Sequence, residues 1–350
     1  MKIGLVSERC CIRILKFCIA LRDAGHSVHA ISQVVPVGRN YYSSVSLFTD
    51  DNSLRNIVSS LNMDLYQVNN EPDTLVKPTK ESAGTRPVLF DIHDLMCLRD
   101  SNMVVQPEEE EAFNYADAFI HVSEPILKIA QEKHGSSKPS IVIYSSMNKI
   151  FLARDEDIIP DPSYKSLVYE GGLNSTLKPE LVNDGKEILT SVRYNVSTFE
   201  AFRKQGYAVN LFSAVPLQNA LYESIGCMVA KPMMYPSMLY GLRPHGIGFV
   251  GSTFSIPLME MAMPNKLFEY MSQGVVPVCY NAGESAKFCA KYDCGIELKG
   301  LDNLDKQLRD AKYKRLNVLK VRKNFTMESQ IPKLLELYET LIPMMVSVKV

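Results

Sequence analysis

The sequence predicts an α/β protein built from two doubly wound domains, each a parallel sheet covered by helices. Two observations indicate this fold class. Strand, helix and strand patterns alternate within the first forty residues, and a second series of the same kind begins near residue 166. At 350 residues the chain is also about two to three times as long as a typical domain. We therefore expect domains at residues 1–158 and 159–350, with the acidic, proline-containing stretch 155–163 as the linker.

The first domain begins with a strand–helix–strand unit. Ile3–Ser7 is an apolar run, Arg9–Ala24 has the composition of a helix that Gly25 ends, and His26–Ser32 is the next strand. Such a unit is right-handed, and its strands are parallel. Further elements are expected as strands at 88–90, 118–122 and 141–144 and as a helix at 108–115.

The second domain repeats this alternation. Strands are expected at 166–169, 208–213, 226–230, 248–250 and 275–279, and helices at 265–273 and 330–341. Ligands of open parallel sheets bind at the carboxyl ends of the strands. Two such domains that face each other would hold their ligands in the cleft between them.

Composition excludes several classes of protein. Lys plus Arg is 38 and Asp plus Glu is 39, so the net charge of -1 gives no indication of nucleic-acid binding. A basic face on one part of the surface is not excluded by this balance. The eight cysteines contain no C-x-x-C pair, which favours reduced thiols and a cytoplasmic location. The first apolar run meets Glu8 and Arg9 too early for a signal peptide, and the longest uncharged runs contain polar residues, so no transmembrane segment is expected.

The common nucleotide and metal motifs are also missing. The loop after the first strand, Ser7–Cys11, has no glycine, and no G-x-x-x-x-G-K-[ST] pattern occurs, which disfavours NAD-dependent oxidoreductases and P-loop NTPases. The six histidines show no metal-binding spacing, and His26 and His29 point to opposite faces of a strand. We expect no metal site.

The most informative segment is MPNKLFEYMSQGVVPV at 263–278. Pro264 suits the first turn of a helix, so the amides of Asn265, Lys266 and Leu267 form a helix N-terminus that can bind a diphosphate. Glu269 lies one turn further on the same side as Asn265, where its carboxylate can accept two hydrogen bonds from a ribose diol. Diphosphate and ribose together indicate a nucleotide. The alternative is a buried amphipathic helix with an exposed glutamate.

The segment PNKLFEYMSQGVVPV closely resembles the donor-site motif of the GT-B glycosyltransferases, in particular the large retaining family 4. The stretches MKIGLVSE, AGHSVHAIS, RPVLFDIHDL, ADAFIHVSEPI, LVYEGGL and NAGESAKFCAKYDCGIEL resemble other parts of that family in the same order. Nearly the whole chain is covered. The resemblance implies the GT-B fold, with two Rossmann-like domains facing across a cleft.

The resemblance also implies roles for donor-binding residues. Glu269 would bind the donor ribose, and the Asn265–Leu267 amides would hold phosphate. Gly171 and Gly172 follow a strand, where glycine lets the backbone approach a ligand, although an ordinary tight turn fits as well. Lys178 is the next cation and either neutralises diphosphate charge or is a solvated lysine. Without tryptophan, stacking on a sugar would fall to tyrosines such as Tyr235 or Tyr270.

The sequence departs from the family pattern in two places. The family commonly carries a second glutamate eight residues before the ribose-binding one, a position occupied here by Met261, with Glu260 one residue away. This difference puts donor-sugar recognition in doubt. The glycine-rich loop after the first strand is replaced by Glu8, Arg9 and Cys10.

Catalytic candidates follow strands of the first domain. His93 and Asp94 lie where the strand at 88–90 ends, and His93 either contacts the donor sugar, takes a proton from the acceptor, or only braces a turn. Glu124 follows the strand at 118–122 and is a weaker candidate. Six basic residues near the C-terminus indicate either a solvated helix face or a surface that binds a phosphate-rich acceptor or a membrane. They are Lys312, Lys314, Arg315, Lys320, Arg322 and Lys323.

The expected function is transfer of a sugar from a UDP- or GDP-linked donor to an acceptor, with retention at the anomeric carbon and without a metal or other cofactor. The acceptor is open among glycans, lipids, small molecules, proteins and modified nucleic-acid bases. Two alternatives stay open. One is a nucleotide-sugar epimerase of the same architecture, and the other is a non-catalytic nucleotide-sugar-binding protein.

Overall fold

A computed structural model describes residues 1–70, 72–99, 102–174, 178–181, 187–190, 193–212 and 219–342. The chain forms two compact units. Unit 1 contains Met1–Leu98, Val104–Asn148 and the described residues from Thr326 on, and unit 2 contains Lys149–Phe325 with the described part of Arg99–Met103. The chain thus returns to unit 1 at its end, and residues 149–158 belong to unit 2. Both features differ from the expected boundaries at 158 and 159.

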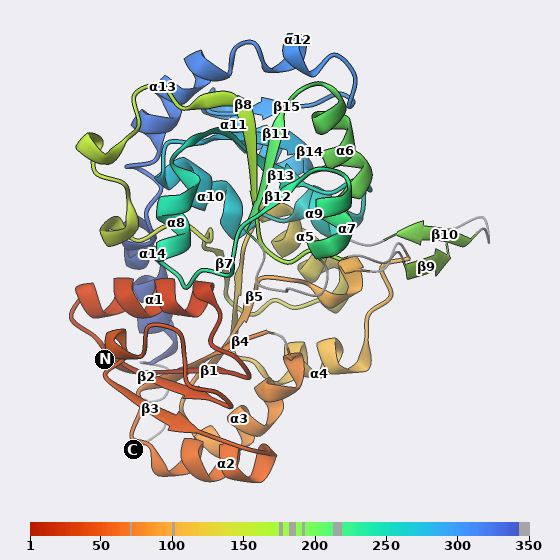
Figure 1. The fold of residues 1–350 in the computed structure, drawn as a ribbon. Helices are drawn as coiled ribbons and strands as arrows, with labels where there is room; N and C mark the ends of the chain where they lie inside the picture. The colour runs from red at the N-terminus through yellow and green to blue at the C-terminus, as the bar shows by residue number, and fades with distance from the viewer. Residues whose placement is uncertain are drawn as a thin grey trace. The chain divides into compact units, whose positions relative to one another are not determined.

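Unit 1 is built on a seven-stranded parallel sheet with the strand order β3-β2-β1-β4-β5-β6-β7 (Figure 1). The strands are β1 (Lys2–Ser7), β2 (Ser27–Ser32), β3 (Ser44–Leu47), β4 (Leu65–Asn69), β5 (Val88–Ile92), β6 (Ala118–His121) and β7 (Ser140–Val142). Its helices are α1 (Ile12–Asp23), α2 (Asp51–Ser60), α3 (Val76–Ala83), α4 (Pro107–Tyr115), α5 (Glu124–His134) and α14 (Met327–Leu341). The strand order reverses direction at β1, which lies between β2 and β4.

Unit 2 is built on a six-stranded parallel sheet with the strand order β12-β11-β8-β13-β14-β15. The strands are β8 (Ser163–Glu170), β11 (Ala208–Phe212), β12 (Met228–Val229), β13 (His245–Gly251), β14 (Val276–Tyr280) and β15 (Ile296–Glu297). Its helices are α6 (Val196–Lys204), α7 (Asn219–Ser224), α8 (Ser237–Leu242), α9 (Pro257–Met261), α10 (Asn265–Ser272), α11 (Gly283–Lys291), α12 (Leu304–Leu308) and α13 (Ala311–Val321). A separate antiparallel pair consists of β9 (Lys178–Leu181) and β10 (Glu187–Thr190). Here the strand order reverses at β8.

The expected doubly wound α/β fold is confirmed, but the sequence analysis missed β3 and β4 in unit 1 and β9, β10 and β15 in unit 2. Strand β4 lies in the middle of the sheet of unit 1, between β1 and β5. Its residues Gln67 and Asn69 are completely buried, and these polar side chains interrupt the apolar pattern that marks a central strand. They are accommodated because Gln67 accepts a hydrogen bond from Tyr338 and Asn69 donates one to Asp91.

Helix α14 joins unit 1 through its apolar face. Met327, Ile331, Leu334, Tyr338 and neighbouring leucines are buried, and α14 packs against α1, which lies beside it in Figure 1. The backbone N–H of Met327 donates to the carbonyl of Met147, and the side chain of Gln330 bonds to the backbone of Tyr144 in both directions. These contacts explain why the end of the chain completes the first sheet.

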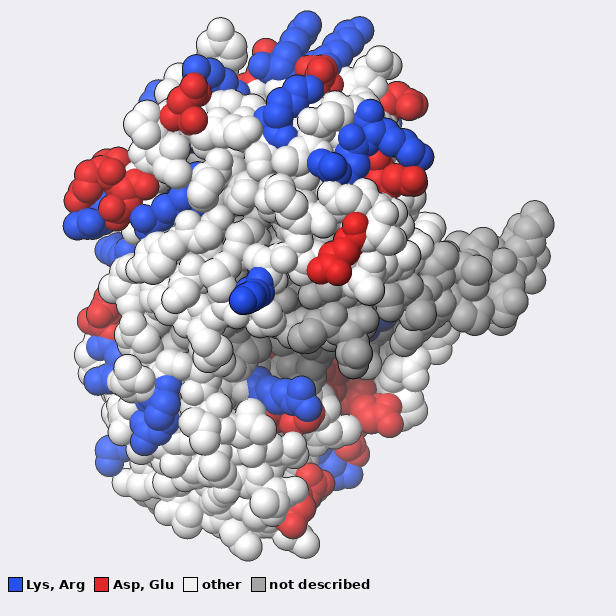
Figure 2. Space-filling model, viewed as in Figure 1, with Lys and Arg blue, Asp and Glu red and all other residues white. Residues whose placement is uncertain are grey.

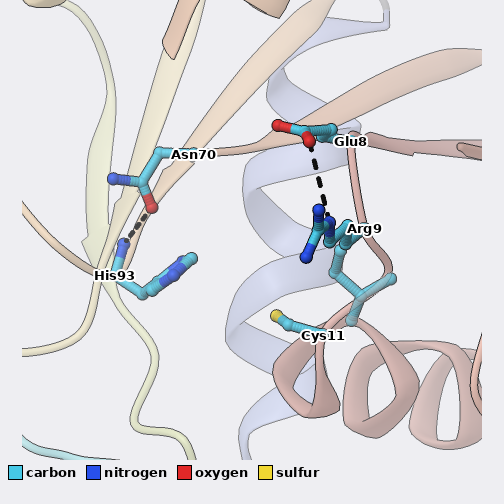
Figure 3. Close-up of a pocket in the computed structure, with 6 residues that line it drawn as sticks. Glu8, Arg9, Cys11, Asn70 and His93 are labelled. Carbon is cyan, nitrogen blue, oxygen red and sulfur yellow. Dashed lines mark hydrogen bonds and ion pairs between the residues drawn. The ribbon is translucent and has the colours of Figure 1, made fainter. Parts of the chain in front are cut away.

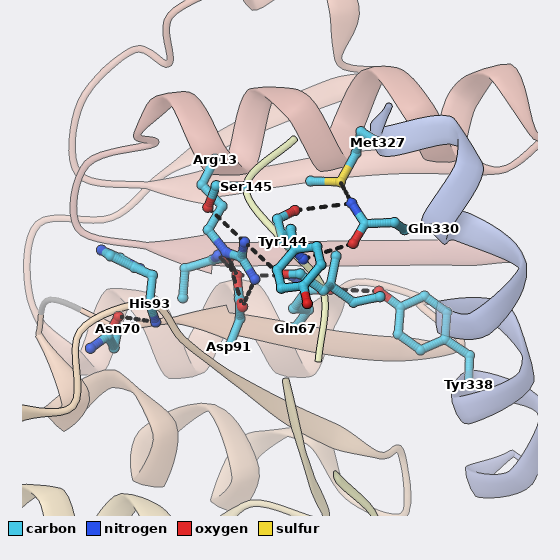
Figure 4. Close-up of polar contacts among 12 residues, drawn as sticks. Arg13, Gln67, Asn70, Asp91, His93, Tyr144, Ser145, Met327, Gln330 and Tyr338 are labelled. Atoms are coloured by element: carbon cyan, nitrogen blue, oxygen red, sulfur yellow. Dashed lines mark hydrogen bonds and ion pairs between the residues drawn. The ribbon is translucent and has the colours of Figure 1, made fainter. Parts of the chain in front are cut away.

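A buried ion pair lies at the centre of unit 1 (Figure 4). Arg13 of α1 and Asp91 of β5 are at most 1% exposed, and the guanidinium contacts both carboxylate oxygens at 2.7–3.1 Å. The remaining donors of Arg13 bond to the carbonyl of Ile143 at 3.0 Å and the hydroxyl of Ser145 at 2.9 Å. Helix α1, strand β5 and the segment after β7 are therefore held together by one side chain.

Among the helices that the structure describes, none is both long and apolar enough to cross a membrane. All eight cysteines carry free thiols.

Replacing Arg13 with Met should lower the free energy of unfolding by about 3–5 kcal/mol, because Asp91 would be left buried without its counter-charge. Urea denaturation followed by circular dichroism measures this loss. As a control, Arg55→Met removes the half-exposed pair with Glu81 and should cost about 0–1 kcal/mol. Equal stability of the two variants would contradict a central role for Arg13.

Candidate functional site

The first group of site residues lies at the carboxyl end of β8, where the strand order of unit 2 reverses. Gly171 follows this strand with a φ of 123°, a conformation that side chains rarely adopt. A Cβ on Gly171 would lie 3.4 Å from the ammonium nitrogen of Lys266, and one on Gly172 would lie 3.1 Å from the guanidinium of Arg193. Two cations therefore flank the glycine turn, and the absent side chains keep the backbone accessible beside them.

Helix α10 begins next to this turn. Pro264 is its N-cap in an extended conformation, and the first turn carries no acidic residue. The N–H of Leu267 donates to the carbonyl of Pro264 at 3.2 Å, so this amide, one of the three expected to hold phosphate, is used within the turn. The ammonium of Lys266 lies 3.9 Å from the ring centre of Tyr169, which fixes it near Gly171. The helix dipole and this cation both favour an anion here.

Glu269 lies one turn into α10 and is 2% exposed. A second carboxylate, that of Glu170 at the end of β8, is 8% exposed. Burial raises the pKa of Tyr235 far above its usual range, and the charges of Glu269 and Glu170 raise it further. The charges of two buried carboxylates of unit 2 thus act on the same phenol, and such carboxylates can accept hydrogen bonds from the hydroxyl groups of a sugar.

The two tyrosines suggested for stacking differ. Tyr270 is completely buried, its hydroxyl accepts the N–H of Glu170 at 3.0 Å, and its ring lies 2.6 Å from where a Cβ on Gly248 would be. It is a core residue, so the expectation that it stacks on a sugar is wrong. Tyr235 is half-buried and lies edge-on to Phe151.

Glu260 has a structural role. One of its carboxylate oxygens accepts the N–H of Gly283 at 2.9 Å, and the other accepts the hydroxyl of Ser255 at 2.8 Å. This carboxylate therefore caps the first turn of α11. Met261, at the position where the family commonly has its second glutamate, ends α9.

Lys178 begins β9, which pairs only with β10 among the described strands. Its side chain lies outside the described residues, so its role in neutralising diphosphate stays a prediction.

A second group of site residues surrounds a cavity of about 300 Å³ in unit 1, lined by Glu8, Arg9, Cys11, Ile14, Asn70 and His93 (Figure 3). Glu8, Arg9 and Cys11 follow β1, Asn70 follows β4 and His93 follows β5. The cavity thus lies at the carboxyl ends of these strands, next to the point where the strand order reverses. Figure 3 shows the side chains of Arg9, Cys11 and His93 directed toward the same space.

Asn70 fixes the turn that carries His93. Its side-chain oxygen accepts the N–H of His93 at 3.1 Å, and its amide group donates to the carbonyl of Asp94. Asp94 is half-buried and does not line the cavity. Glu124 is exposed and does not line it either. It is the first residue of α5, where the helix dipole favours an acid and Ser123 provides the cap. Of the three catalytic candidates, the structure brings only His93 to this cavity.

The basic residues near the C-terminus are largely structural. Arg315 is 6% exposed and donates to the carbonyls of Gly274, Ile159 and Pro160. Arg322 is 2% exposed and donates to the carbonyls of Ala153 and Ser272 and to Asp155. Three further members pair with acids: Lys312 with Asp161, Lys314 with Asp293 and Lys323 with Asp155. Figure 2 shows basic side chains lying next to acidic ones on the surface of the protein.

Within the described residues, no group of three or more His, Cys, Asp or Glu side chains is arranged to hold a metal ion.

Comparison with known proteins identifies the fold. No family model and no curated protein sequence matches the chain. Among solved structures, sucrose-phosphate synthase from Thermosynechococcus elongatus is 12% identical with a TM-score of 0.68, covering 98% of this chain and 99% of that one. Anabaena HepE in complex with UDP is 12% identical with a TM-score of 0.69, covering 96% and 100%. An alpha-glucosyltransferase in complex with UDP and DNA containing an HMU base is 11% identical with a TM-score of 0.65, covering 97% and 99%.

These likenesses extend over the full length of each neighbour. The fold is that of the GT-B glycosyltransferases, as the sequence predicted. At this level of identity the comparison establishes the fold alone.

Sequence reasoning missed Arg193 and Glu170 and considered Lys266 only for its backbone amide. Glu170 directly precedes Gly171, so its position was a usable signal. Arg193 lies more than twenty residues beyond Gly171, and only the folded chain brings its guanidinium to the turn.

Glu269→Gln should weaken UDP binding by about 1–3 kcal/mol, because an amide is a weaker acceptor for ribose hydroxyl groups than a carboxylate. Isothermal titration calorimetry with UDP and with uridine measures this. Both ligands contain the ribose, so both should lose affinity. Glu297→Gln, at an exposed position on β15, is the control and should bind like the wild type. Unchanged uridine affinity in Glu269→Gln would remove Glu269 from the ribose site.

Proposed function

We propose that this protein is a glycosyltransferase that transfers a sugar from a UDP- or GDP-linked donor to an acceptor with retention at the anomeric carbon. One observation carries the proposal. In unit 2, at the sheet position where ligands of this fold class bind, buried Glu269 and Glu170 lie with Tyr235, and Lys266 and Arg193 flank the adjacent glycine turn. This combination suits a ribose and a diphosphate. Retention rests on the resemblance to family 4.

The residues of unit 2 would bind the donor and stabilise its leaving group. As the bond between the anomeric carbon and the phosphate oxygen breaks, its electron pair stays on the diphosphate. The cations Lys266 and Arg193, the start of α10 and, by the family resemblance, Lys178 would stabilise that charge. The likeness to Anabaena HepE supports this assignment, since that neighbour was solved in complex with UDP.

The cavity of unit 1 would bind the acceptor. Its lining offers a carboxylate, a guanidinium, a thiol, an amide and an imidazole, which suit an acceptor rich in hydroxyl groups. The acceptor oxygen bonds to the anomeric carbon, and we assign its proton to His93. Asp94 and Glu124 remain candidates for supporting contacts. The acceptor itself belongs to one of the classes named above.

We further propose that catalysis needs no metal and that the protein works in the cytoplasm. The first proposal is supported by the cations and helix N-terminus available for the diphosphate, and the second by the eight free cysteines.

Incubation with a panel of UDP- and GDP-sugars and candidate acceptors, followed by mass spectrometry and NMR of the product, tests the function. Transfer should give a product with the anomeric configuration of the donor, and it should survive EDTA. Loss of transfer with EDTA and recovery with Mg²⁺ would overturn metal independence. Conversion of the nucleotide sugar without an acceptor would favour an epimerase. Binding without turnover would favour a non-catalytic protein. Two departures from the family pattern agree with that alternative: Glu260 caps α11, and Met261 occupies the position of the second glutamate.

His93→Ala should lower kcat by about tenfold to a thousandfold, or about 1.4–4 kcal/mol in the barrier, because no imidazole would then take the proton of the sugar acceptor. The melting temperature and UDP affinity should change little, since the donor residues lie in unit 2. His26→Ala is the control, because His26 contacts the N-terminal amine and does not line the cavity. A His93→Ala variant that loses stability but keeps its kcat would show that His93 only braces the turn.

A further inference from the structure

Unit 1 exposes a small apolar surface that the proposed mechanism does not use. Val34 and Val35, in the segment after β2, are 47% and 64% exposed, and Leu47, the last residue of β3, is 49% exposed. Single exposed apolar residues are ordinary on a protein surface. Here, however, three lie at the carboxyl ends of two neighbouring parallel strands. We call Val34, Val35 and Leu47 the apolar rim.

Backbone pairing brings the members of the apolar rim together. Ser32 and Leu47 are partners in the register of β2 and β3, and Val34 follows Ser32 by two residues. The N–H of Phe48 donates to the carbonyl of Ser32 at 3.0 Å, which keeps the two strands paired up to their ends. Neighbouring strands of a sheet lie about 4.8 Å apart, so the rim occupies one small region of the surface.

The segment that carries the two valines is anchored on both sides. The hydroxyl of Ser32, which is completely buried, donates to the carbonyl of Val34 at 2.7 Å. Pro36, the residue after Val35, is buried and favours an extended backbone at Val35. The valines are therefore exposed although the backbone around them is held in place.

The apolar rim adjoins the cavity of unit 1. The N–H of Gln33 donates to the carbonyl of Glu8 at 3.0 Å, and Glu8 lines the cavity. Val34 is the next residue, so the rim begins directly beyond the contact with the cavity wall. The sheet order agrees with this, because β2 lies between β3 and β1, whose end carries Glu8 and Arg9 (Figure 1). A molecule bound in the cavity can thus extend over the ends of β2 and β3 within unit 1.

The cavity and the rim differ in their chemistry. The cavity offers the carboxylate of Glu8, the guanidinium of Arg9 and the imidazole of His93, which suit hydroxyl groups (Figure 3). Residues 30–38 and 40–49, which contain the rim, include no Asp, Glu, Lys or Arg. These segments offer no charge to an ionic ligand, whereas an apolar chain that covers the rim removes apolar surface from water.

We propose that the acceptor is amphipathic, with a hydroxyl-rich head group in the cavity and an attached alkyl chain that lies over Val34, Val35 and Leu47. This proposal rests on the proposed function. In the transfer step a hydroxyl oxygen of the head group bonds to the anomeric carbon, and its proton moves to His93. The bond from that carbon to the diphosphate breaks, and its electron pair stays on the diphosphate. The alkyl chain takes no part in this step and contributes to binding alone.

Alkyl glycosides test the rim by binding alone, without turnover. Methyl and hexyl β-D-glucopyranoside share one head group and differ only in the length of the alkyl chain. A methylene that is about half buried gains roughly twofold in affinity, so the hexyl glucoside should bind about tenfold to thirtyfold more tightly than the methyl glucoside. Isothermal titration calorimetry below the micelle concentration measures both affinities.

Val34→Ser combined with Val35→Ser should reduce this gain to about threefold or less and leave the affinity for the methyl glucoside within about twofold of the wild type. Leu47→Ser, on the other strand, should reduce the gain as well, and it serves as the test should the double variant not fold. Leu316→Ser is the matched control, because Leu316 is 59% exposed on α13 of unit 2, and it should keep the full gain. A hexyl glucoside that binds wild type no more tightly than the methyl glucoside, or a gain that survives in the variants of the rim, would overturn the proposal.

Other occupants of the rim would give different results. A rim that docks on a membrane would make wild type, but not the double variant, bind phosphatidylcholine vesicles. A rim that contacts a second copy of this chain would make wild type a dimer and the double variant a monomer in sedimentation velocity. Either result without a gain from the hexyl chain contradicts an amphipathic acceptor.

Transfer separates this proposal from the proposed function. With the nucleotide sugar that gives the fastest turnover, kcat/KM for the hexyl glucoside should exceed that for the methyl glucoside by about the same factor as the affinity, with similar kcat. A wild type that turns over no nucleotide sugar contradicts the proposed function, and the binding series then still decides whether the rim holds an alkyl chain. An active wild type with equal kcat/KM for the two glucosides contradicts the amphipathic acceptor alone.

Discussion

The buried pair of Arg13 and Asp91 is the constraint on which unit 1 depends. Removing two charges from water is costly, and the cost is offset only where every donor and acceptor finds a partner. Here the carboxylate of Asp91 accepts hydrogen bonds from Arg13 and Asn69, and Arg13 also donates hydrogen bonds to the segment after β7. Burial together with Arg13 lowers the pKa of His121 to about 3, which keeps this neighbour uncharged beside the pair. Satisfying one ion pair thus fixes α1, β4, β5 and the segment after β7 relative to one another.

The same constraint places the functional groups of unit 1. Asp91 lies two residues before His93 on β5, and Asn69 lies one residue before Asn70 on β4. The ends of both strands are therefore anchored from inside the sheet, just before the residues that line the cavity. The corresponding position in unit 2, the end of β8, is anchored by Tyr270, whose hydroxyl accepts the N–H of Glu170. In each unit a fully buried polar contact holds the strand end from which the site residues extend.

The sequence was informative where a local pattern determines the structure. Alternation of strands and helices predicted both sheets, and the Pro264–Glu269 pattern predicted the helix that carries the buried Glu269. It failed where long-range contacts override local pattern. The polar Gln67 and Asn69 concealed the central strand β4, because the partners that allow their burial are on α14 and β5. Arg193 carries no motif, and the basic residues near the C-terminus resembled a solvated face although two of the arginines are buried.

The position of the acids in unit 2 follows from helix geometry. In the family pattern two glutamates eight residues apart serve the donor, whereas here the upstream acid is shifted by one residue to Glu260. One residue corresponds to a rotation of about 100° in an α-helix, and Glu260 on α9 is directed to the first amide of α11. The carboxylate that accompanies Glu269 is instead Glu170, from the end of β8, because the charges of both act on Tyr235 and Tyr270. Unit 2 of this chain therefore has one buried acid at the end of a strand and another on a helix, and two cations flank the glycine turn that follows the strand.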